Sequence, residues 1–166
     1  MENINKFFEE ISFHNRYNQI AYKFFVCYSR FEYSLKMAGY IHTPNGQTFP
    51  QASLIDYART MDQTIDLNDQ IIKEQIDYIV NYPPNELHIF NTQLQWFPLI
   101  PQSRSIDFIF RCMRTVRNNL FHGNKQLPGN SIQRNIDLIS SFLPVIDYLI
   151  EQNQEVKNYF LSTLEN

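Results

Sequence analysis

Apolar residues recur at intervals of three and four over residues 17–35, and this spacing constrains the fold more than any other feature of the sequence. One face of an α-helix repeats with that period, so the segment is predicted to be a long amphipathic helix. The residues that define the pattern are Tyr17, Ile20, Ala21, Phe24, Tyr28, Phe31 and Leu35. Gly39 follows them at the position where a glycine commonly ends a helix. The first element of the chain is therefore predicted to pack aromatic side chains into a core.

Four further regions are predicted to be helical. Their ranges are 53–61, 67–80, 106–122 and a region from Ser131 to the C-terminus. Ser131 is expected to cap the last region, and Pro144 predicts a kink there or two abutting helices. The chain, residues 1–166, is thus predicted to be a single all-α domain, a helical bundle without strands.

Two segments between these helices have the composition of loops. Residues 41–51, IHTPNGQTFPQ, hold two prolines and an Asn-Gly pair. Residues 83–101 hold four of the eight prolines and several aromatic residues, including Trp96. Proline removes a backbone donor, and both segments are rich in residues that favour turns. The second segment is predicted to be an ordered loop packed on the surface.

The charge and cysteine content restrict the function and the setting. The formal net charge is −3, which excludes a protein that coats nucleic acid electrostatically, so any RNA contact must come from a local basic patch. Cys27 and Cys112 are too few for a disulfide framework, which favours a reduced, cytoplasmic setting. The N-terminal sequence MENINKFFEE is charged where a signal peptide needs an apolar run, and no stretch predicts a membrane span.

The predicted helix 106–122 has one apolar and one polar face. The apolar stripe consists of Ile109, Met113, Val116 and Leu120. The polar face consists of Arg111, Arg114, Asn118 and His122. Arg117 lies on the flank between them. Ser103 or Ser105 is predicted to cap the helix, and Gly123 to follow its end.

The polar face carries groups that can cleave a phosphodiester without a metal. A neutral histidine can accept a proton from a ribose 2′-hydroxyl or protonate a leaving oxygen near neutral pH. A guanidinium offers a planar pair of donors to a phosphate and stabilises the charge that builds on it. Asn118, one turn before His122, can orient the imidazole or donate to a phosphate oxygen. Because the attacking hydroxyl belongs to the substrate, such chemistry is restricted to RNA.

The string RNNLFHG, residues 117–123, resembles the R-x4-6-H motif of the HEPN superfamily. Its flanks, in VRNNLFHGNK, are similar to a bacterial subgroup found among toxin and phage-defence proteins. A second string, SRFEYSLKMAGY at residues 29–40, resembles the first-helix pattern of that subgroup. With the C-terminal segment ending QEVKNYF, the resemblance spans most of the chain and is weakest between residues 43 and 99.

The resemblance implies an HEPN-like helical bundle that dimerises through its motif-bearing helices. The two motifs would meet in one composite cleft that cuts single-stranded or loop RNA without metal or cofactor. Arg117 and His122 match the motif, Asn118 is the polar residue that follows the Arg, and Glu32 is the candidate supporting acid. Asn124 stands where some family members have an aromatic residue, so no role of that aromatic carries over.

Other residues of the chain have both a functional and a structural interpretation. Arg111, Arg114 and Lys125 are candidate RNA or phosphate contacts, with solvated surface charges as the alternative. Glu32 has the alternative of a surface acid paired within its helix. The remaining histidines, His14, His42 and His88, lack partners at metal-ligand spacing and are interpreted as surface or packing residues.

The function that these observations favour is a metal-independent endoribonuclease of toxin or phage-defence type, acting on RNA as a homodimer. The alternative is a non-catalytic HEPN module that binds RNA, a nucleotide or a protein partner, which the acidic pI of about 5.8 favours. A third possibility is a site that a nucleotidyltransferase-type antitoxin modifies or masks. A six-residue motif alone does not separate these alternatives.

Overall fold

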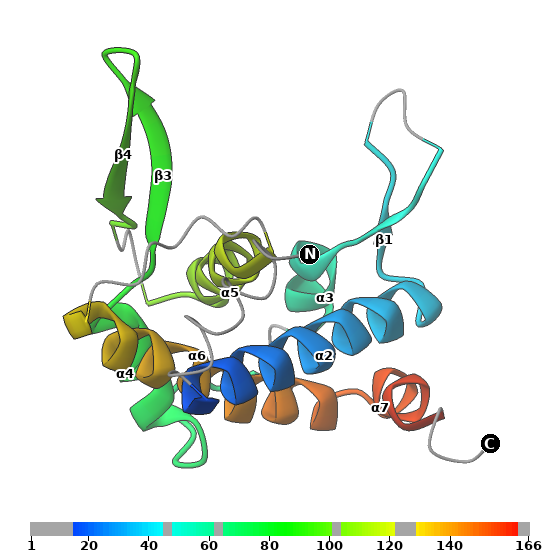
Figure 1. The fold of residues 1–166 in the computed structure, drawn as a ribbon. Coiled ribbons are helices and arrows are strands. Elements are labelled where there is room, and N and C mark those ends of the chain that lie inside the picture. The colour runs from blue at the N-terminus through cyan, green and yellow to red at the C-terminus, as the bar shows by residue number, and fades with distance from the viewer. Residues whose placement is uncertain (1–14, 45–47, 62–64, 101–103, 122–128, 163–166) are drawn as a thin grey trace.

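The computed structural model of the chain describes residues 15–44, 48–61, 65–100, 104–121 and 129–162. Six helices and two β-hairpins lie within these ranges, and Figure 1 shows both hairpins projecting from the same side of the helices. The helices are α2 (Asn15–Met37), α3 (Leu54–Thr60), α4 (Lys73–Asn81), α5 (Ile106–Phe121), α6 (Gly129–Glu151) and α7 (Gln154–Leu161). The strands are β1 (Ile41–His42), β2 (Gln51–Ala52), β3 (Asn85–Phe90) and β4 (Gln93–Pro98). The fold is therefore mostly helical, as predicted, but not strand-free.

Helix α2 confirms the predicted first helix and its stop signal. Its periodic residues Phe24, Tyr28, Phe31 and Leu35 are all 0% exposed. Gly39 has a φ of +85°, and the next amide, that of Tyr40, donates to the Leu35 carbonyl over 2.9 Å. This is the hydrogen bond of a Schellman motif, which a residue without a Cβ adopts most readily.

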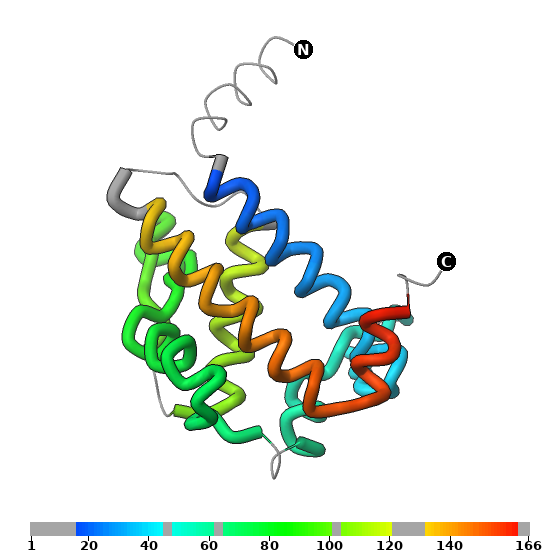
Figure 2. The backbone as a smooth tube through the Cα atoms, turned by 90° about the horizontal axis from the view of Figure 1, so that it is seen from below, coloured from blue at the N-terminus to red at the C-terminus, as the bar shows by residue number. Residues whose placement is uncertain are grey.

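The core lies where α2 crosses the C-terminal helices. Helix α2 packs most extensively against α6 and α7, while α4 packs on α6 (Figure 2). Phe24 of α2 lies 5.9 Å, between ring centroids, from Phe142 of α6. Tyr57 of α3 is 0% exposed, and its hydroxyl donates to the Leu149 carbonyl of α6. These contacts hold α2 and α3 against α6 in the core.

Helix α5 confirms the apolar stripe predicted for residues 106–122. Ile109 and Met113 are 0% exposed and Val116 is 1% exposed, while Leu120 is partly buried against the same core. Ser105 caps the helix by accepting a hydrogen bond from the Phe108 amide over 3.3 Å. The predicted stop at Gly123 lies outside the described residues.

Residues 83–101 are not the predicted surface loop, because they contain a regular antiparallel hairpin. Strands β3 and β4 pair from Asn85 opposite Pro98 to Phe90 opposite Gln93. Asn91 and Thr92 join them with φ values of 48° and 66°, as in a two-residue type I′ turn. A threonine rarely adopts a positive φ, so the turn lacks the usual Asn-Gly signal. One face of the hairpin is entirely apolar away from its base, and consists of Leu87, Ile89, Leu94 and Trp96.

The segment predicted as a second loop, residues 41–51, also contains a short strand at each end. Ile41 and His42 of β1 pair with Ala52 and Gln51 of β2. The predicted short helix after it is confirmed as α3. Ser53 caps α3 by accepting the Asp56 amide over 3.2 Å.

Two predicted helix starts are wrong. Helix α4 begins at Lys73 and not at 67, because the carboxylates of Asp66 and Asp69 accept backbone amides two residues further on, over 2.8 and 2.9 Å. Such Asx turns compete with helix formation. Helix α6 begins at Gly129, so Ser131 lies inside the helix and is not its cap.

Pro144 does not divide the last helical region. Helix α6 runs through Pro144, and the chain breaks instead at 152–153. Asn153 then caps α7 by accepting the amides of Glu155 and Val156 over 3.0 and 3.1 Å. Within the described ranges no helix combines the length and apolarity of a membrane span.

Candidate functional site

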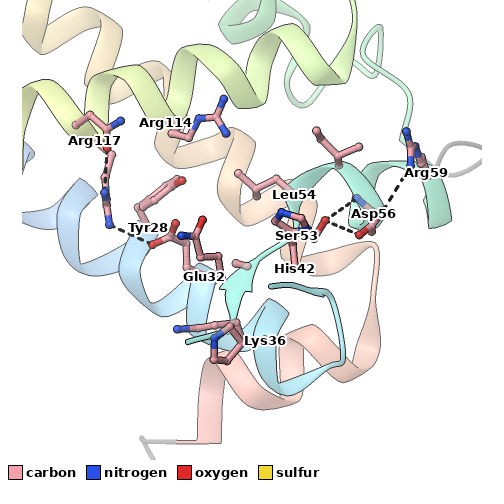
Figure 3. A pocket seen from close by; sticks show the side chains of 15 residues that line it. Tyr28, Glu32, Lys36, His42, Ser53, Leu54, Asp56, Arg59, Arg114 and Arg117 are labelled. Atoms are coloured by element: carbon pink, nitrogen blue, oxygen red, sulfur yellow. Dashed lines mark hydrogen bonds and ion pairs between the residues drawn. The ribbon is translucent and has the colours of Figure 1, made fainter. Parts of the chain in front are cut away.

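The polar side of α5 borders a cleft of about 710 Å³ that α2, the β1–β2 hairpin and α3 complete. Of the predicted site residues, Arg114, Arg117 and Asn118 line it from α5, and Glu32 lines it from α2 (Figure 3). The structure thus brings together, within one chain, residues that are more than eighty positions apart in the sequence. His122 and Lys125 lie outside the described residues.

Arg117 is held in place by two neighbours. Its Nη1 donates to Asn118 Oδ1 over 2.9 Å, and its Nη2 lies 3.7 Å from the Glu32 carboxylate. The side chains of Arg117 and Glu32 are 34% and 28% exposed, so this ion pair is only partly screened by solvent. Two fixed contacts restrict the guanidinium to a narrow set of orientations, which is how a phosphate-binding arginine is preorganised.

Arg111 does not belong to the cleft, although it is aligned with Arg114 on the helical wheel. Its Nη2 pairs with the Glu86 carboxylate of β3 over 3.0 Å. Thr115 donates to the same carboxylate over 3.2 Å. Burial alone would raise the pKa of Glu86, but the hydrogen bond and charge of Arg111, with further hydrogen bonds from Thr115 and His88, lower it. Arg111 therefore anchors the β3–β4 hairpin to α5.

Helix α2 presents three cleft residues at intervals of one turn. Tyr28, Glu32 and Lys36 follow at i, i+4 and i+8 and all line the cleft. Tyr28 is 0% exposed. Burial and the nearby Glu32 carboxylate raise its pKa, and the charges of Arg117 and Arg114 oppose this only in part. Tyr28 therefore remains a neutral hydroxyl at physiological pH.

The third wall of the cleft comes from the β1–β2 hairpin and α3. His42 of β1 lines it, together with Asp56 and Arg59 of α3. Asp56 accepts a hydrogen bond from the Ser53 hydroxyl over 2.6 Å and lies 3.6 Å from Arg59. His42, interpreted from the sequence as a surface or packing residue, is exposed but faces the same cleft as Arg117.

The cleft has an excess of positive charge although the chain as a whole is acidic. Two carboxylates of the described residues, Glu32 and Asp56, line it, and each has an arginine partner. Four cationic side chains of the same part of the chain line it: Lys36, Arg59, Arg114 and Arg117. The net charge of the chain is −3. The arrangement thus supplies the local basic patch that an RNA contact would require.

The described residues contain no group of three or more His, Cys, Asp or Glu side chains that could hold a metal ion. No family model, no curated protein and no solved structure matches the chain.

Proposed function

We propose that the protein is a metal-independent endoribonuclease of toxin or phage-defence type, in which two copies of the chain combine their Arg117–His122 motifs into one composite site. The observation that carries the proposal is the fixed position of Arg117, between Glu32 and Asn118, on the wall of a cationic cleft. The resemblance of the sequence to the HEPN motif implies that Arg117 binds the phosphate of the substrate. A cleft of about 710 Å³ is within the size range of ligand sites.

In the proposed reaction the ribose 2′-oxygen attacks the adjacent phosphorus atom and the bond from phosphorus to the 5′-oxygen breaks. One histidine accepts the 2′-hydroxyl proton and another donates a proton to the leaving 5′-oxygen, so a composite site with two copies of His122 supplies both transfers. Arg117 stabilises the charge on the non-bridging oxygens, and Asn118 positions Arg117. The products are a 2′,3′-cyclic phosphate and a 5′-hydroxyl.

The decisive experiment compares RNA cleavage by the wild type, Arg117→Ala and His122→Ala in excess EDTA. Arg16→Ala and His88→Ala are matched controls, because both residues are exposed and neither lines the cleft. We expect the wild type and both controls to leave cyclic-phosphate ends, and both motif variants to lose at least a hundredfold in rate. Cleavage by His122→Ala at the wild-type rate would refute the proposal.

The same comparison separates this function from a non-catalytic HEPN module. If the wild type binds RNA without cleaving it, and binding survives His122→Ala, the binding module is the better description. Intact-mass analysis of protein purified from its native host would detect covalent modification by a nucleotidyltransferase-type antitoxin.

The composite site also requires a dimer in solution. Light scattering should give a mass near twice the chain mass of 19.9 kDa. A monomer at micromolar concentration that still cleaves RNA would remove the second histidine from the mechanism and leave His42, on the cleft wall, as the next candidate.

A further inference from the structure

The buried Tyr28 hydroxyl has no hydrogen-bonding partner among the described residues. Tyr28 is 0% exposed, and among the described residues its hydroxyl makes no hydrogen bond. The Glu32 carboxylate raises the pKa of Tyr28 through its charge and as a nearby acceptor, but it does not lie at hydrogen-bonding distance and angle from the hydroxyl. Folded proteins satisfy nearly all buried polar groups, so an unsatisfied hydroxyl on the wall of a cleft is available to a group that enters the cleft.

Two cations that form no ion pair within the described part of the chain face the same space. Arg114 and Lys36 are exposed and line the cleft, and neither makes an ion pair with a described residue. Arg114 is close enough to Tyr28 to lower its pKa, and Lys36 lies two turns beyond Tyr28 on α2. Figure 3 shows the Tyr28 hydroxyl directed into the cleft between Arg114 and Glu32.

The chemistry of these three groups fits a phosphate. A guanidinium and an ammonium are cationic donors that accept no hydrogen bond, and the neutral tyrosine hydroxyl can donate to an anionic oxygen. Glu32 and Asp56 are the carboxylates of the cleft and are already paired with arginines, so they repel an anion less than free carboxylates would. Arg114 precedes Arg117 by three residues, which is about 4.5 Å along an α-helix, so both can reach neighbouring phosphates of one strand.

We propose that Tyr28, Arg114 and Lys36 form a second phosphate subsite, so that each chain holds the phosphate next to the scissile one of a single-stranded RNA. The inference rests on the proposed function, in which Arg117 takes the scissile phosphate. It adds residues from α2 that the HEPN-like motif does not contain. The substrate class is therefore an RNA strand that continues past the cleaved bond into the cleft, and not an isolated nucleotide.

Binding of a strand that cannot be cleaved tests the subsite without catalysis. The probe is a fluorescein-labelled octamer of 2′-O-methyluridine, which has no attacking hydroxyl, measured by fluorescence anisotropy from about 50 to 300 mM salt. We expect Lys36→Ala and Arg114→Ala each to weaken binding and to reduce the slope of log affinity against log salt by about 0.7. Lys23→Ala and Arg16→Ala, on the same helix as Lys36 but outside the cleft, should leave both quantities unchanged.

Tyr28→Phe separates a role in binding from a role in folding. Removal of the hydroxyl should weaken binding about tenfold at constant salt slope, because it deletes a hydrogen bond to a charged oxygen but no charge. The melting temperature of the free protein should not fall, because the hydroxyl has no partner to lose. A lower melting temperature with unchanged affinity would show a structural role and overturn the assignment of Tyr28.

The outcomes distinguish the subsite from the proposed function. RNA cleavage that depends on Arg117 and His122, with wild-type affinity and slope in Lys36→Ala and Arg114→Ala, overturns the subsite alone. Absence of cleavage, with binding that depends on Lys36 and Arg114 as stated, refutes the nuclease and supports Tyr28, Arg114 and Lys36 as a phosphate site of an RNA-binding module. A wild type that does not bind the octamer overturns the subsite.

Discussion

Replacement of Glu86 by glutamine tests how the β3–β4 hairpin is held on the helical bundle. The Glu86 carboxylate accepts hydrogen bonds from Arg111 over 3.0 Å and from Thr115 over 3.2 Å, and lies 3.3 Å from the His88 ring nitrogen. Arg111 and Thr115 belong to α5, so the carboxylate links the base of strand β3 to that helix. Glu86→Gln keeps the size and an acceptor oxygen but removes the charge.

The expected cost follows from the exposure of each partner. The Arg111 side chain is 47% exposed, and an ion pair this open contributes about 0.2–1 kcal/mol. Thr115 is 7% exposed, and its hydrogen bond falls from about 1.5–3 kcal/mol with a charged acceptor to about 0.5–1.5 kcal/mol with a neutral one. The free energy of unfolding should therefore fall by about 1–2 kcal/mol, which lowers the melting temperature by about 2–8 °C in a chain of this length.

The lowered pKa of Glu86 gives this contribution a defined pH range. The contribution is present above the unfolded-state pKa of about 4.3 and is lost as the pH falls through the lower folded-state value. Wild type should thus lose the stabilisation from Glu86 in mild acid. Glu86→Gln lacks this stabilisation at every pH. Its free energy of unfolding should therefore depend less on pH than that of the wild type below about pH 5.

The single tryptophan allows unfolding of the β3–β4 hairpin to be measured separately from unfolding of the helices. Trp96 lies on β4 and is 38% exposed, so its fluorescence reports on the hairpin while circular dichroism reports on the helices. The fluorescence transition of Glu86→Gln should move to lower temperature at pH 7. Glu74→Gln is the matched control, because Glu74 is exposed on α4 and its replacement changes the net charge equally. Equal melting temperatures for both variants, with equal acid dependence, would refute the anchor.

Three other substitutions test separate parts of the structure. Gly39→Ala should cost about 1–2 kcal/mol in urea unfolding, because φ is +85° and the added methyl meets open space, so only backbone strain is measured. Tyr57→Phe should cost about 0.5–1.5 kcal/mol in the same assay, because it removes a buried hydrogen bond to the Leu149 carbonyl, which keeps the Gln152 amide as a donor over 3.3 Å. Asn118→Ala should slow single-turnover RNA cleavage by about ten- to a hundredfold at an unchanged melting temperature, because Arg117 loses a positioning contact.

The helices were predictable where burial alone determines the pattern. The stripe from Tyr17 to Leu35 and the stripe of α5 both face a core, so a period near 3.6 reveals them. The β3–β4 hairpin was not predictable in the same way. Its turn is Asn91-Thr92, a pair that rarely adopts two positive φ values, and four prolines in the segment indicated a loop. The helix near Leu67 was placed too early because side-chain turns at aspartates compete with helical hydrogen bonds.

Part of the cleft was predictable and part was not. Arg117 and Asn118 are adjacent in the sequence, whereas Glu32 belongs to a second string, and its separation from the motif along the chain does not predict a contact in space. Their juxtaposition in the structure depends on the packing of α2 against α5. His42 and Arg59 have no local signal at all, because only the tertiary placement of the β1–β2 hairpin and α3 brings them to the cleft.

Arg111 and Arg114 are aligned on one helix face and therefore have the same sequence pattern, yet they have different roles in the structure. The β3–β4 hairpin neutralises Arg111 through Glu86, while no described residue neutralises Arg114. Elsewhere, Arg30 donates to the carbonyls of Tyr159 and Phe160, so its donors are occupied by the fold.

The charge of Arg114 is therefore not used in a structural ion pair with a described residue, and it remains on the wall of the cleft. Because the net charge is −3, a strand several Debye lengths away is not attracted by the protein as a whole. Binding should depend on contacts made after the strand reaches the cleft. Substitutions of Lys36 and Arg114 should accordingly alter the dissociation rate of RNA more than its association rate, which stopped-flow anisotropy can measure. Equal effects on both rates would instead indicate long-range steering.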